Sequence, residues 1–393
     1  MKKFICLLLC FSLIFSVPIV GGTEEVPEAG PSVTAVSAVL IEGSTGKVLY
    51  AKDKDKELVP ASITKIMTLV LIFDALDNKK IKLTDKVTVS ENAAKKGGSQ
   101  VYLEPGETQT VNDMIKCICI ASANDAAAAM AEKIAGSESA FVERMNAKAK
   151  KLGMKHTQFK NCTGLDDDIT SGHYTSAYDV ALMSREVITK HPEISKFSTT
   201  WMDKITHVTK KGSKEFGLTN TNKLVRFYQG ITGLKTGSTS KAKYCLSATA
   251  NRNGMDLIAV IMAAPDVKAR FAEATTLLDY GFSNCALYQE DFKNMQTAPQ
   301  KISGGMEDII SLVPEKTFTY VFTDGADTSK VEKKISYQES ISAPIKKGAP
   351  YGTIEYQYNG RTLGKVNLVA TKDINQAGFG HVFSQLLNHF FKH

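Results

Sequence analysis

Ser62 and Lys65 stand three residues apart at the start of an apolar run, in the stretch VPASITKIMT. Three residues of helix return a side chain to nearly the same face, so the Ser62 hydroxyl and the Lys65 amine could touch. A hydroxyl beside an amine can act as a nucleophile with its general base. The same spacing also fits an ordinary helix start, with Pro60 in the first turn and Lys65 in solvent. The pair alone therefore predicts no chemistry.

Two further short patterns contain residues with suitable chemistry. Ser122 and Asn124 enclose an alanine in a helical region, and Lys235, Thr236 and Gly237 follow one another in a strand-like run. Each pattern alone fits a helix terminus or the end of a strand with a turn glycine. Together, in the order Ser-x-x-Lys, Ser-x-Asn and Lys-Thr-Gly, the three patterns match the motif set of the penicillin-recognising serine enzymes.

These residues need elements that bring three distant segments together. Apolar residues have helical spacing from Pro60 to about Gly153, on both sides of Ser122, and a further helix is expected to begin after Thr175 or Ser176. Strand patterns lie before and after this helical region. They are a hairpin around residues 43–46 and two runs over 230–239 and 243–266, followed by a helix from about residue 267.

The C-terminal part of the chain changes character. Residues 285–371 alternate between short strands and turns, with a strong hairpin signal at Asn359-Gly360, and we expect a small all-β domain. Residues 372–393 are expected to form an amphipathic helix that binds the membrane surface, because the segment is too short and too polar to span a bilayer. A helix packed on the β domain is the alternative. The residues of its apolar face are Phe379, Val382, Phe383, Leu386, Leu387, Phe390 and Phe391.

The N-terminus has the order of residues that is typical of a secretory signal peptide. Two lysines precede an apolar run, which is followed by small and polar residues. We assign residues 1–22 to the signal peptide and residues 23–34 to a linker, with an uncleaved membrane anchor as the alternative. We therefore expect export to the outer face of the bacterial cytoplasmic membrane or the cell wall.

The composition argues against several other classes of function. A formal net charge of +7 on 393 residues is too small and too dispersed for nucleic-acid binding. The cysteines after the signal peptide are odd in number and lack zinc spacing, so we expect buried thiols. Asp166 to Asp168 are expected to be solvated, and His173 to pack or cap. We predict neither a metal site nor a cofactor.

The chain resembles the low-molecular-mass penicillin-binding proteins that act as serine-type D-alanyl-D-alanine carboxypeptidases. Beside the three motifs, the phrases PASITKIMT, ASANDAA, GLKTGST and RFAEATTLLDYGF are similar to that family, and the likeness covers about residues 35–371. The resemblance implies an α/β (α+β) fold. Residues 35–284 would form a β-lactamase/transpeptidase-like domain with an antiparallel sheet flanked by helices, and residues 285–371 the small C-terminal all-β domain.

The resemblance and the chemistry of acyl transfer suggest roles for the motif residues. Ser62 would be acylated, and Lys65 would be the general base that takes its proton. Burial and a second positive charge at Lys235 would keep the Lys65 amine neutral. Ser122 would relay a proton to the leaving amine, and Asn124 would hydrogen-bond the substrate or orient Lys65.

Substrate recognition is expected at the strand that contains the Lys-Thr-Gly pattern. As an edge strand it could pair with an extended peptide, and a side chain at Gly237 would crowd that approach. The resemblance implies an oxyanion hole made by the backbone N–H groups of Ser62 and Ser238. For Arg270, a solvated helix residue is an equal alternative to substrate binding. The groups expected to bind the free carboxylate of the substrate are Lys235, Thr236 and Arg270.

The predicted function is removal of the terminal D-alanine from peptidoglycan stem pentapeptides that end in D-Ala-D-Ala, with β-lactam antibiotics as covalent inhibitors. A DD-endopeptidase is an alternative that the sequence barely separates. A catalytically silent β-lactam or wall-binding protein is less consistent with the complete motif set. A class A β-lactamase needs a glutamate that activates the deacylating water, and the corresponding stretch, residues 151–165, contains none.

Overall fold

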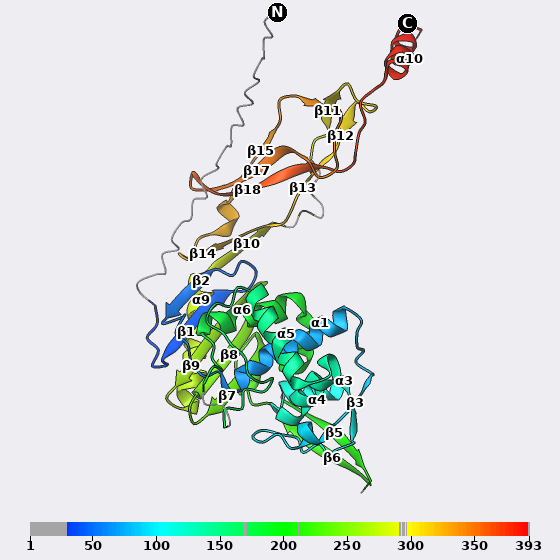
Figure 1. Cartoon of the computed structure of the whole chain (residues 1–393). Coiled ribbons are helices and arrows are strands. Elements are labelled where there is room, and N and C mark those ends of the chain that lie inside the picture. The colour runs from blue at the N-terminus through cyan, green and yellow to red at the C-terminus, as the bar shows by residue number, and fades with distance from the viewer. Residues whose placement is uncertain are drawn as a thin grey trace, which may run out of the picture.

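The computed structural model describes residues 30–167, 171–210, 212–290, 292, 295 and 297–391. The expected signal peptide, the linker up to residue 29, Asp168 and the last two residues of the expected C-terminal helix lie outside these ranges. The described chain forms a larger domain of helices and sheet and a smaller domain of strands, joined end to end (Figure 1). No helix within the described ranges is long and apolar enough to cross a membrane.

The larger domain is built on a five-stranded antiparallel sheet with the order β2-β1-β9-β8-β7, so β7 lies at an edge. Val39 and Ile41 belong to the apolar core on one face, whereas Ala38 and Leu40 belong to the core on the other. Successive side chains of a strand alternate between faces, so both faces need a cover. The strands are β1 (Ser37–Glu42), β2 (Val48–Lys52), β7 (Ile231–Thr239), β8 (Lys243–Arg252) and β9 (Met255–Ala264).

Helices cover both faces of this sheet, as the resemblance implied (Figure 1). On one face, α9 (Val267–Asn284) buries Leu277 and Leu278. On the other face lies the main helical group, in which Ser176 caps α6 as predicted by accepting a hydrogen bond from the Asp179 N–H. The helices of this group are α1 (Lys65–Asp77), α3 (Val111–Cys119), α4 (Asn124–Ala135), α5 (Glu138–Lys151) and α6 (Ala177–Lys190).

Short elements complete the larger domain. They include a hairpin of β5 (Met202–Thr209) and β6 (Gly212–Thr219), which the sequence analysis did not predict. The others are the 3₁₀ turns η1 (Ala61–Thr64) and η2 (Pro192–Ile194), the pair β3 (Lys86–Thr88) and β4 (Thr108–Thr110), and the single-turn helices α2 (Glu91–Ala94), α7 (Ser195–Ser198) and α8 (Leu224–Phe227).

The smaller domain is built of strands, as expected, and its described residues also include short 3₁₀ segments such as η4 (Thr328–Lys330). Its longest strands form the predicted hairpin, in which Asn359 and Gly360 have φ angles of 48° and 77°. Two consecutive positive φ angles match the twist of the flanking strands. The strands are β10 (Ala286–Glu290), β11 (Gln300–Ser303), β12 (Ile309–Ile310), β13 (Leu312–Pro314), β14 (Phe318–Phe322), β15 (Glu332–Tyr337), β16 (Ile341–Ser342), β17 (Pro350–Tyr358) and β18 (Arg361–Ala370).

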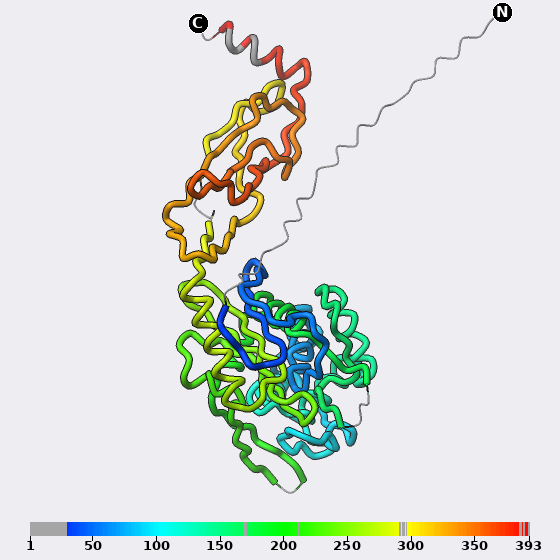
Figure 2. The backbone as a smooth tube through the Cα atoms, turned by 90° about the vertical axis from the view of Figure 1, so that its left-hand side faces the viewer, coloured from blue at the N-terminus to red at the C-terminus, as the bar shows by residue number. Residues whose placement is uncertain are grey.

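The chain stays attached to the smaller domain for several residues after β18. Ile374 is buried there and exchanges backbone hydrogen bonds with Ile345. The terminal helix α10 (Phe379–Phe390) begins only after this attachment. Both backbone views place α10 at the end of the molecule that is far from the larger domain (Figures 1 and 2).

A loop over residues 161–165 lies against the turn η1, which contains Ser62. Gly164 has a φ of +82°, and a Cβ atom at this position would lie 1.7 Å from the carbonyl oxygen of Ala61. No side chain can occupy that space unless the backbone moves. Glycine at position 164 therefore allows the loop and the turn to approach each other closely.

We expect Gly164→Ala to destabilise the larger domain much more than Gly153→Ala does. Gly153 has a similar φ of +76° but has no atom within 4 Å of an added Cβ. The loss in the free energy of unfolding of Gly153→Ala therefore measures the effect of the positive φ alone. That cost is about 1 kcal/mol, and the backbone clash at Gly164 should add at least about 2 kcal/mol. Urea unfolding followed by the fluorescence of Trp201, the single tryptophan, measures both variants. Equal losses in the two variants would contradict the close approach.

Candidate active site

The structure brings Ser62 and Lys65 into direct contact. Ser62 lies in η1 and is half-buried, whereas Lys65 begins α1 and is fully buried. Lys65 Nζ lies 2.9 Å from Ser62 Oγ and donates a hydrogen bond of 2.8 Å to the carbonyl oxygen of Thr163. The non-glycine residue Ala61 has a φ of 47° just before the serine. Non-glycine residues with a positive φ cluster at active sites, and this one lies directly before the half-buried serine.

Burial and neighbouring positive charge act together on the Lys65 amine. Burial, and after it the charge of Lys235, hold the pKa of Lys65 well below its usual range. Lys235 in β7 is also buried, and burial, with a further contribution from the Arg270 guanidinium, lowers the pKa of Lys235 to about 7. An amine that is neutral near pH 7 can accept a proton from a hydroxyl at hydrogen-bond distance.

Ser122 and Asn124 lie at the break between α3 and α4. Ser122 has a φ of 62°, and Asn124 is the first residue of α4. The Asn124 amide donates to the carbonyl oxygen of Gly97 at 2.7 Å, but its Oδ1 and the Ser122 Oγ are buried without a hydrogen-bond partner among the described residues. Unpaired buried polar atoms cost free energy. These two are therefore candidates for contacts with a bound substrate.

The edge strand β7 packs its Lys-Thr-Gly segment against the Ser62 turn. Lys235 and Thr236 are buried, and Ser238 is exposed. A Cβ atom on Gly237 would lie 2.9 Å from the carbonyl oxygen of Pro60 and 3.1 Å from the Ile63 nitrogen. The structure thus gives a different reason for this glycine from the one that the sequence suggested. The protein's own turn, rather than a bound peptide, occupies the space beside its Cα.

Arg270 is not a solvated helix residue, so that alternative is wrong. It lies in α9 with only 7% of its surface exposed, and its Nη1 donates to the carbonyl oxygen of Gly237 at 3.2 Å. A contact with the Cys245 carbonyl oxygen at 3.4 Å adds a second bond to the sheet. Arg270 thus ties α9 to β7 beside the motif. Its role as a carboxylate ligand stays a prediction.

Other residues that the sequence singled out have structural contacts. His173 Nδ1 accepts from the Lys160 N–H, and Nε2 contacts Thr64 Oγ1 at 2.9 Å. Burial lowers the pKa of His173 to about 4, so it packs as a neutral ring. Asp166 was expected to be solvated, but it is buried and accepts from Thr239 Oγ1, because the loop folds against the end of β7. The cysteines from 117 onward are free and buried, as predicted.

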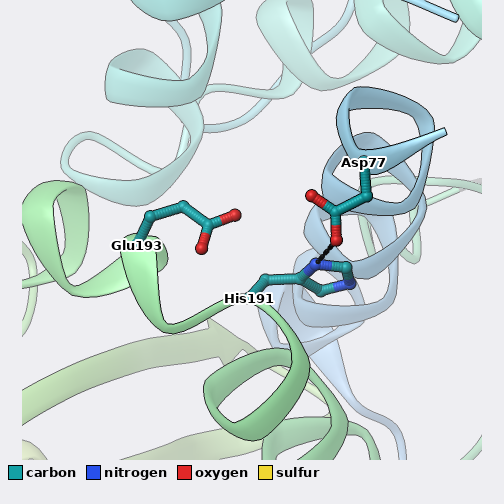
Figure 3. A group of neighbouring side chains, drawn as sticks. All are labelled: Asp77, His191 and Glu193. Atoms are coloured by element: carbon teal, nitrogen blue, oxygen red, sulfur yellow. Dashed lines mark ion pairs between the residues drawn. The ribbon is translucent and has the colours of Figure 1, made fainter. Parts of the chain in front are cut away.

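One group of side chains outside the motifs consists of residue types that commonly bind metal ions. Donor atoms of Asp77, His191 and Glu193 lie within 4.8 Å of one another (Figure 3). Both ring nitrogens of His191 already contact carboxylates, Nδ1 that of Asp77 at 2.9 Å and Nε2 that of Asp74 at 3.2 Å. Although burial opposes it, these carboxylates raise the pKa of His191. His191 thus forms ion pairs with Asp74 and Asp77 at the end of α1, and we assign no metal to the group.

Sequence reasoning missed the carbonyl group that holds Lys65. Thr163 contributes through its backbone carbonyl group, and the type of a residue does not indicate what its carbonyl group binds. A weak signal exists in the stretch Asn161 to Gly164, because asparagine followed by glycine three residues later is typical of a side-chain-stabilised turn. Asn161 Oδ1 accepts from the N–H groups of Thr163 and Gly164 at 3.1 and 2.7 Å.

Comparisons with known proteins agree with this arrangement. A family model described as D-alanyl-D-alanine carboxypeptidase matches residues 23–266, and a model of the penicillin-binding protein 5 C-terminal domain matches residues 282–376. The chain is 47% identical over 345 residues to D-alanyl-D-alanine carboxypeptidase DacF of Bacillus subtilis, which covers 88% of this chain and 87% of that protein. It is 32% identical over 391 residues to DacC of Escherichia coli, with coverage of 97% and 94%.

Solved structures show the same architecture. The crystal structure of penicillin binding protein 5 from Haemophilus influenzae is similar with a TM-score of 0.75 and 30% identity, covering 89% of this chain and all of that one. Penicillin binding protein 6B from Escherichia coli is similar with a TM-score of 0.70 and 30% identity, covering 88% and 99%. The similarity includes both domains.

We expect Lys65→Arg to reduce acylation of the protein by benzylpenicillin by at least about 100-fold, because guanidinium stays protonated and cannot act as base. In the wild type, burial and the charge of Lys235 lower the pKa of Lys65, so acylation should fall as pH falls through that lowered pKa. Stopped-flow labelling against pH measures both effects. Lys133→Arg, at an exposed position of α4, is the matched control. Near-normal acylation of a folded Lys65→Arg variant would exclude Lys65 as the base.

Proposed function

The chain belongs to the D-alanyl-D-alanine carboxypeptidase family and is a serine-type carboxypeptidase, and we propose that it works through an acyl-enzyme at Ser62. The observation that carries this assignment is the buried Lys65 amine, 2.9 Å from the Ser62 hydroxyl and with a lowered pKa. The substrate class is a peptidoglycan stem peptide that ends in D-Ala-D-Ala. β-Lactam antibiotics would react with the same serine and remain attached to it.

The proposed reaction has two steps on the same residues. Lys65 takes the Ser62 proton as Oγ attacks the carbonyl carbon between the two D-alanines, and the C–N bond breaks when the leaving amine receives a proton through Ser122. Water then adds to the ester carbonyl, the bond between this carbon and Ser62 Oγ breaks, and a proton from the water returns to Oγ through Lys65 as the shortened peptide leaves with a free carboxylate. Oxyanion stabilisation by backbone N–H groups of Ser62 and Ser238 typically contributes about 3 kcal/mol.

Substrate binding is proposed at the free edge of β7. An extended peptide can pair with the backbone of this strand, since β7 lies at the edge of the sheet and, among the described strands, pairs with β8 on one side only. Asn124 Oδ1, which lacks a partner among the described residues, could accept from a substrate N–H group. Lys235 and Thr236 would bind the terminal carboxylate, and Arg270 would support them from behind the strand.

Hydrolysis of the penicillin adduct should be slow. The hydrogen bonds of the Ser62 and Lys65 side chains, within the described part of the chain, go to each other and to the Thr163 carbonyl oxygen. No carboxylate joins this set, so the glutamate that a class A β-lactamase uses to activate water has no counterpart in it. This supports a carboxypeptidase over a β-lactamase.

Benzylpenicillin should add once to the protein, at Ser62, and the adduct should persist for minutes or longer. Intact-mass analysis followed by peptide mapping measures this, and release of D-alanine from a pentapeptide ending in D-Ala-D-Ala measures the activity. Ser62→Ala should lose both. The mechanism is wrong if the wild type forms no adduct or if Ser62→Ala forms the same one.

We also propose that the protein is exported and that α10 binds the outer surface of the cytoplasmic membrane. The order of residues 1–22 supports export. Several large apolar side chains of α10 are exposed, which would be costly unless a lipid surface or partner covers them. The exposed ones are Phe379, Val382, Phe383, Leu387 and Phe390, and Phe391, directly after the helix, is exposed as well. The smaller domain would then hold the active site away from the membrane (Figure 2).

Truncation after Gly378 should abolish binding to anionic liposomes and leave the hydrolysis of a soluble pentapeptide nearly unchanged. The truncated protein keeps the residues up to Gly378, because Ile374 is buried in the smaller domain and its removal would affect the fold. Phe383→Glu/Phe390→Glu in the full chain should have the same effect, since a charge opposes insertion into lipid. Flotation with liposomes measures binding. Continued flotation of the folded truncated protein would exclude α10 as the anchor.

A further inference from the structure

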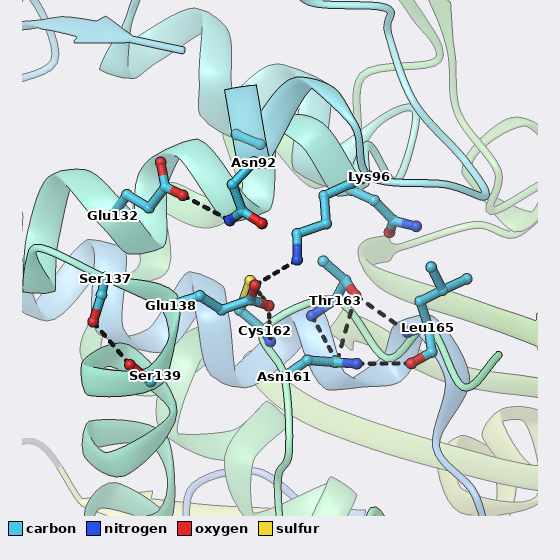
Figure 4. Close-up of polar contacts among 12 residues, drawn as sticks. Asn92, Lys96, Glu132, Ser137, Glu138, Ser139, Asn161, Cys162, Thr163 and Leu165 are labelled. Carbon is cyan, nitrogen blue, oxygen red and sulfur yellow. Dashed lines mark hydrogen bonds and ion pairs between the residues drawn. The ribbon is translucent and has the colours of Figure 1, made fainter. Parts of the chain in front are cut away.

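We propose that Glu138 is a positioning residue, whose carboxylate holds together the two loops that support Lys65 and Asn124 (Figure 4). The inference rests on the proposed function, because it assigns the active-site roles to those two residues. Glu138 is the first residue of α5 and touches no motif side chain in the described contacts. It would act through the backbone of the two loops.

The first loop presents the carbonyl group that binds Lys65. Glu138 Oε1 lies 3.2 Å from both the backbone nitrogen and the Sγ atom of Cys162, which donate to it. The next residue, Thr163, offers its carbonyl oxygen to Lys65 Nζ at 2.8 Å. The Cys162 carbonyl oxygen accepts from Thr68 Oγ1 at 2.6 Å, so this loop is attached to α1 one turn beyond Lys65.

The second loop presents the carbonyl group that binds Asn124. Glu138 Oε2 forms an ion pair of 2.6 Å with Lys96 Nζ, and both side chains are largely shielded from solvent. Lys96 is followed by Gly97, whose carbonyl oxygen accepts from the Asn124 amide at 2.7 Å. The backbone N–H of Asn124 donates to the carbonyl oxygen of Ser99 at 2.7 Å. The loop over 96–99 therefore sets the position of Asn124.

The two oxygens of one carboxylate thus connect the supports of two active-site side chains. Although burial opposes ionisation, the hydrogen bond and charge of Lys96 and the contacts with Cys162 hold the pKa of Glu138 below its usual range. The Glu138 carboxylate and its contacts with Lys96 and Cys162 are called the clamp from here on, and the carboxylate stays ionised at neutral pH. A charge-assisted pair that is shielded from water is screened less by salt than a surface pair, and it is geometrically more specific.

Loss of the Glu138 contacts should raise the pKa of Lys65, an effect that a loss of stability alone does not have. Burial is the largest cause of the low pKa of Lys65. If the loop over 161–165 loosens, water reaches the amine, and the pKa of Lys65 rises toward that of an ordinary lysine. Acylation would then require a higher pH, in addition to being slower because the groups are misplaced.

The test compares Glu138→Gln, Glu138→Ala and Glu132→Gln in the full-length protein. Glutamine keeps an acceptor but removes the charge, whereas alanine removes both contacts. Glu132 is the matched control, because its carboxylate accepts a hydrogen bond from the side chain of Asn92 at the protein surface and, among the described residues, forms no other (Figure 4). The readouts are the rate constant of acylation by benzylpenicillin, its dependence on pH, and the thermal midpoint of unfolding.

We expect acylation to fall about 10-fold in Glu138→Gln and about 100-fold in Glu138→Ala, with the acid limb of the pH profile moved to higher pH in both. Glu132→Gln should match the wild type. Combining Glu138→Gln with Lys96→Met should cost less than the sum of the single changes, because both break one contact.

Two outcomes would overturn the clamp. One is near-normal acylation by a folded Glu138→Ala protein, and the other is slower acylation with an unmoved acid limb, which would indicate a structural role only. Failure of the proposed function looks different, since the wild type itself would then form no adduct at Ser62.

Discussion

The buried amine of Lys65 is the constraint on which the rest of the structure depends. A lysine without solvent is costly in its charged form, and the cost is reduced when the amine becomes neutral. In its neutral form the Lys65 amine can accept a proton at a pH at which an ordinary lysine is already protonated. The Ser62 hydroxyl and the Thr163 carbonyl oxygen form hydrogen bonds with the amine, and the charge of Lys235 adds to the effect of burial on its pKa.

Keeping water away from this amine requires close packing around the Ser62 turn, and two glycines allow it. Gly164 approaches the carbonyl oxygen of Ala61 from the loop over 161–165, and Gly237 approaches the carbonyl oxygen of Pro60 from β7. The turn is therefore held between two backbone segments, neither of which places a side chain of its own against the turn at Gly164 or Gly237. Three segments that are far apart in the chain converge in this way. Arg270 then fixes the position of β7 by a bond to Gly237 itself.

The candidate site and the terminal helix lie in different parts of the molecule. The larger domain holds every residue of the candidate site, while the smaller domain ends in α10 at the far end of the molecule (Figures 1 and 2). The contacts between the domains include bonds from Lys47 to the carbonyl oxygen of Val321 and from Gly325 to that of Asn284. In the proposed arrangement on a membrane, this separation would bring the site to the height of the peptidoglycan rather than of the lipid.

The sequence by itself determined the features that depend on local periodicity and on residue type. Helical spacing places Ser62 and Lys65 on one face, Ser176 begins a helix because its hydroxyl accepts a backbone N–H, and Asn359-Gly360 forms a turn because both residues tolerate positive φ. The three motifs and their order indicated the chemistry. Only the tertiary structure decided that Asp166 is buried, that Arg270 bonds to β7, and that Gly237 faces the protein's own turn. It also supplied the Thr163 carbonyl and the Glu138 contacts. These features join segments that are distant in the chain, and several of them use backbone atoms, which are the same in every residue. No local spacing of side chains along the sequence could reveal which distant segments meet.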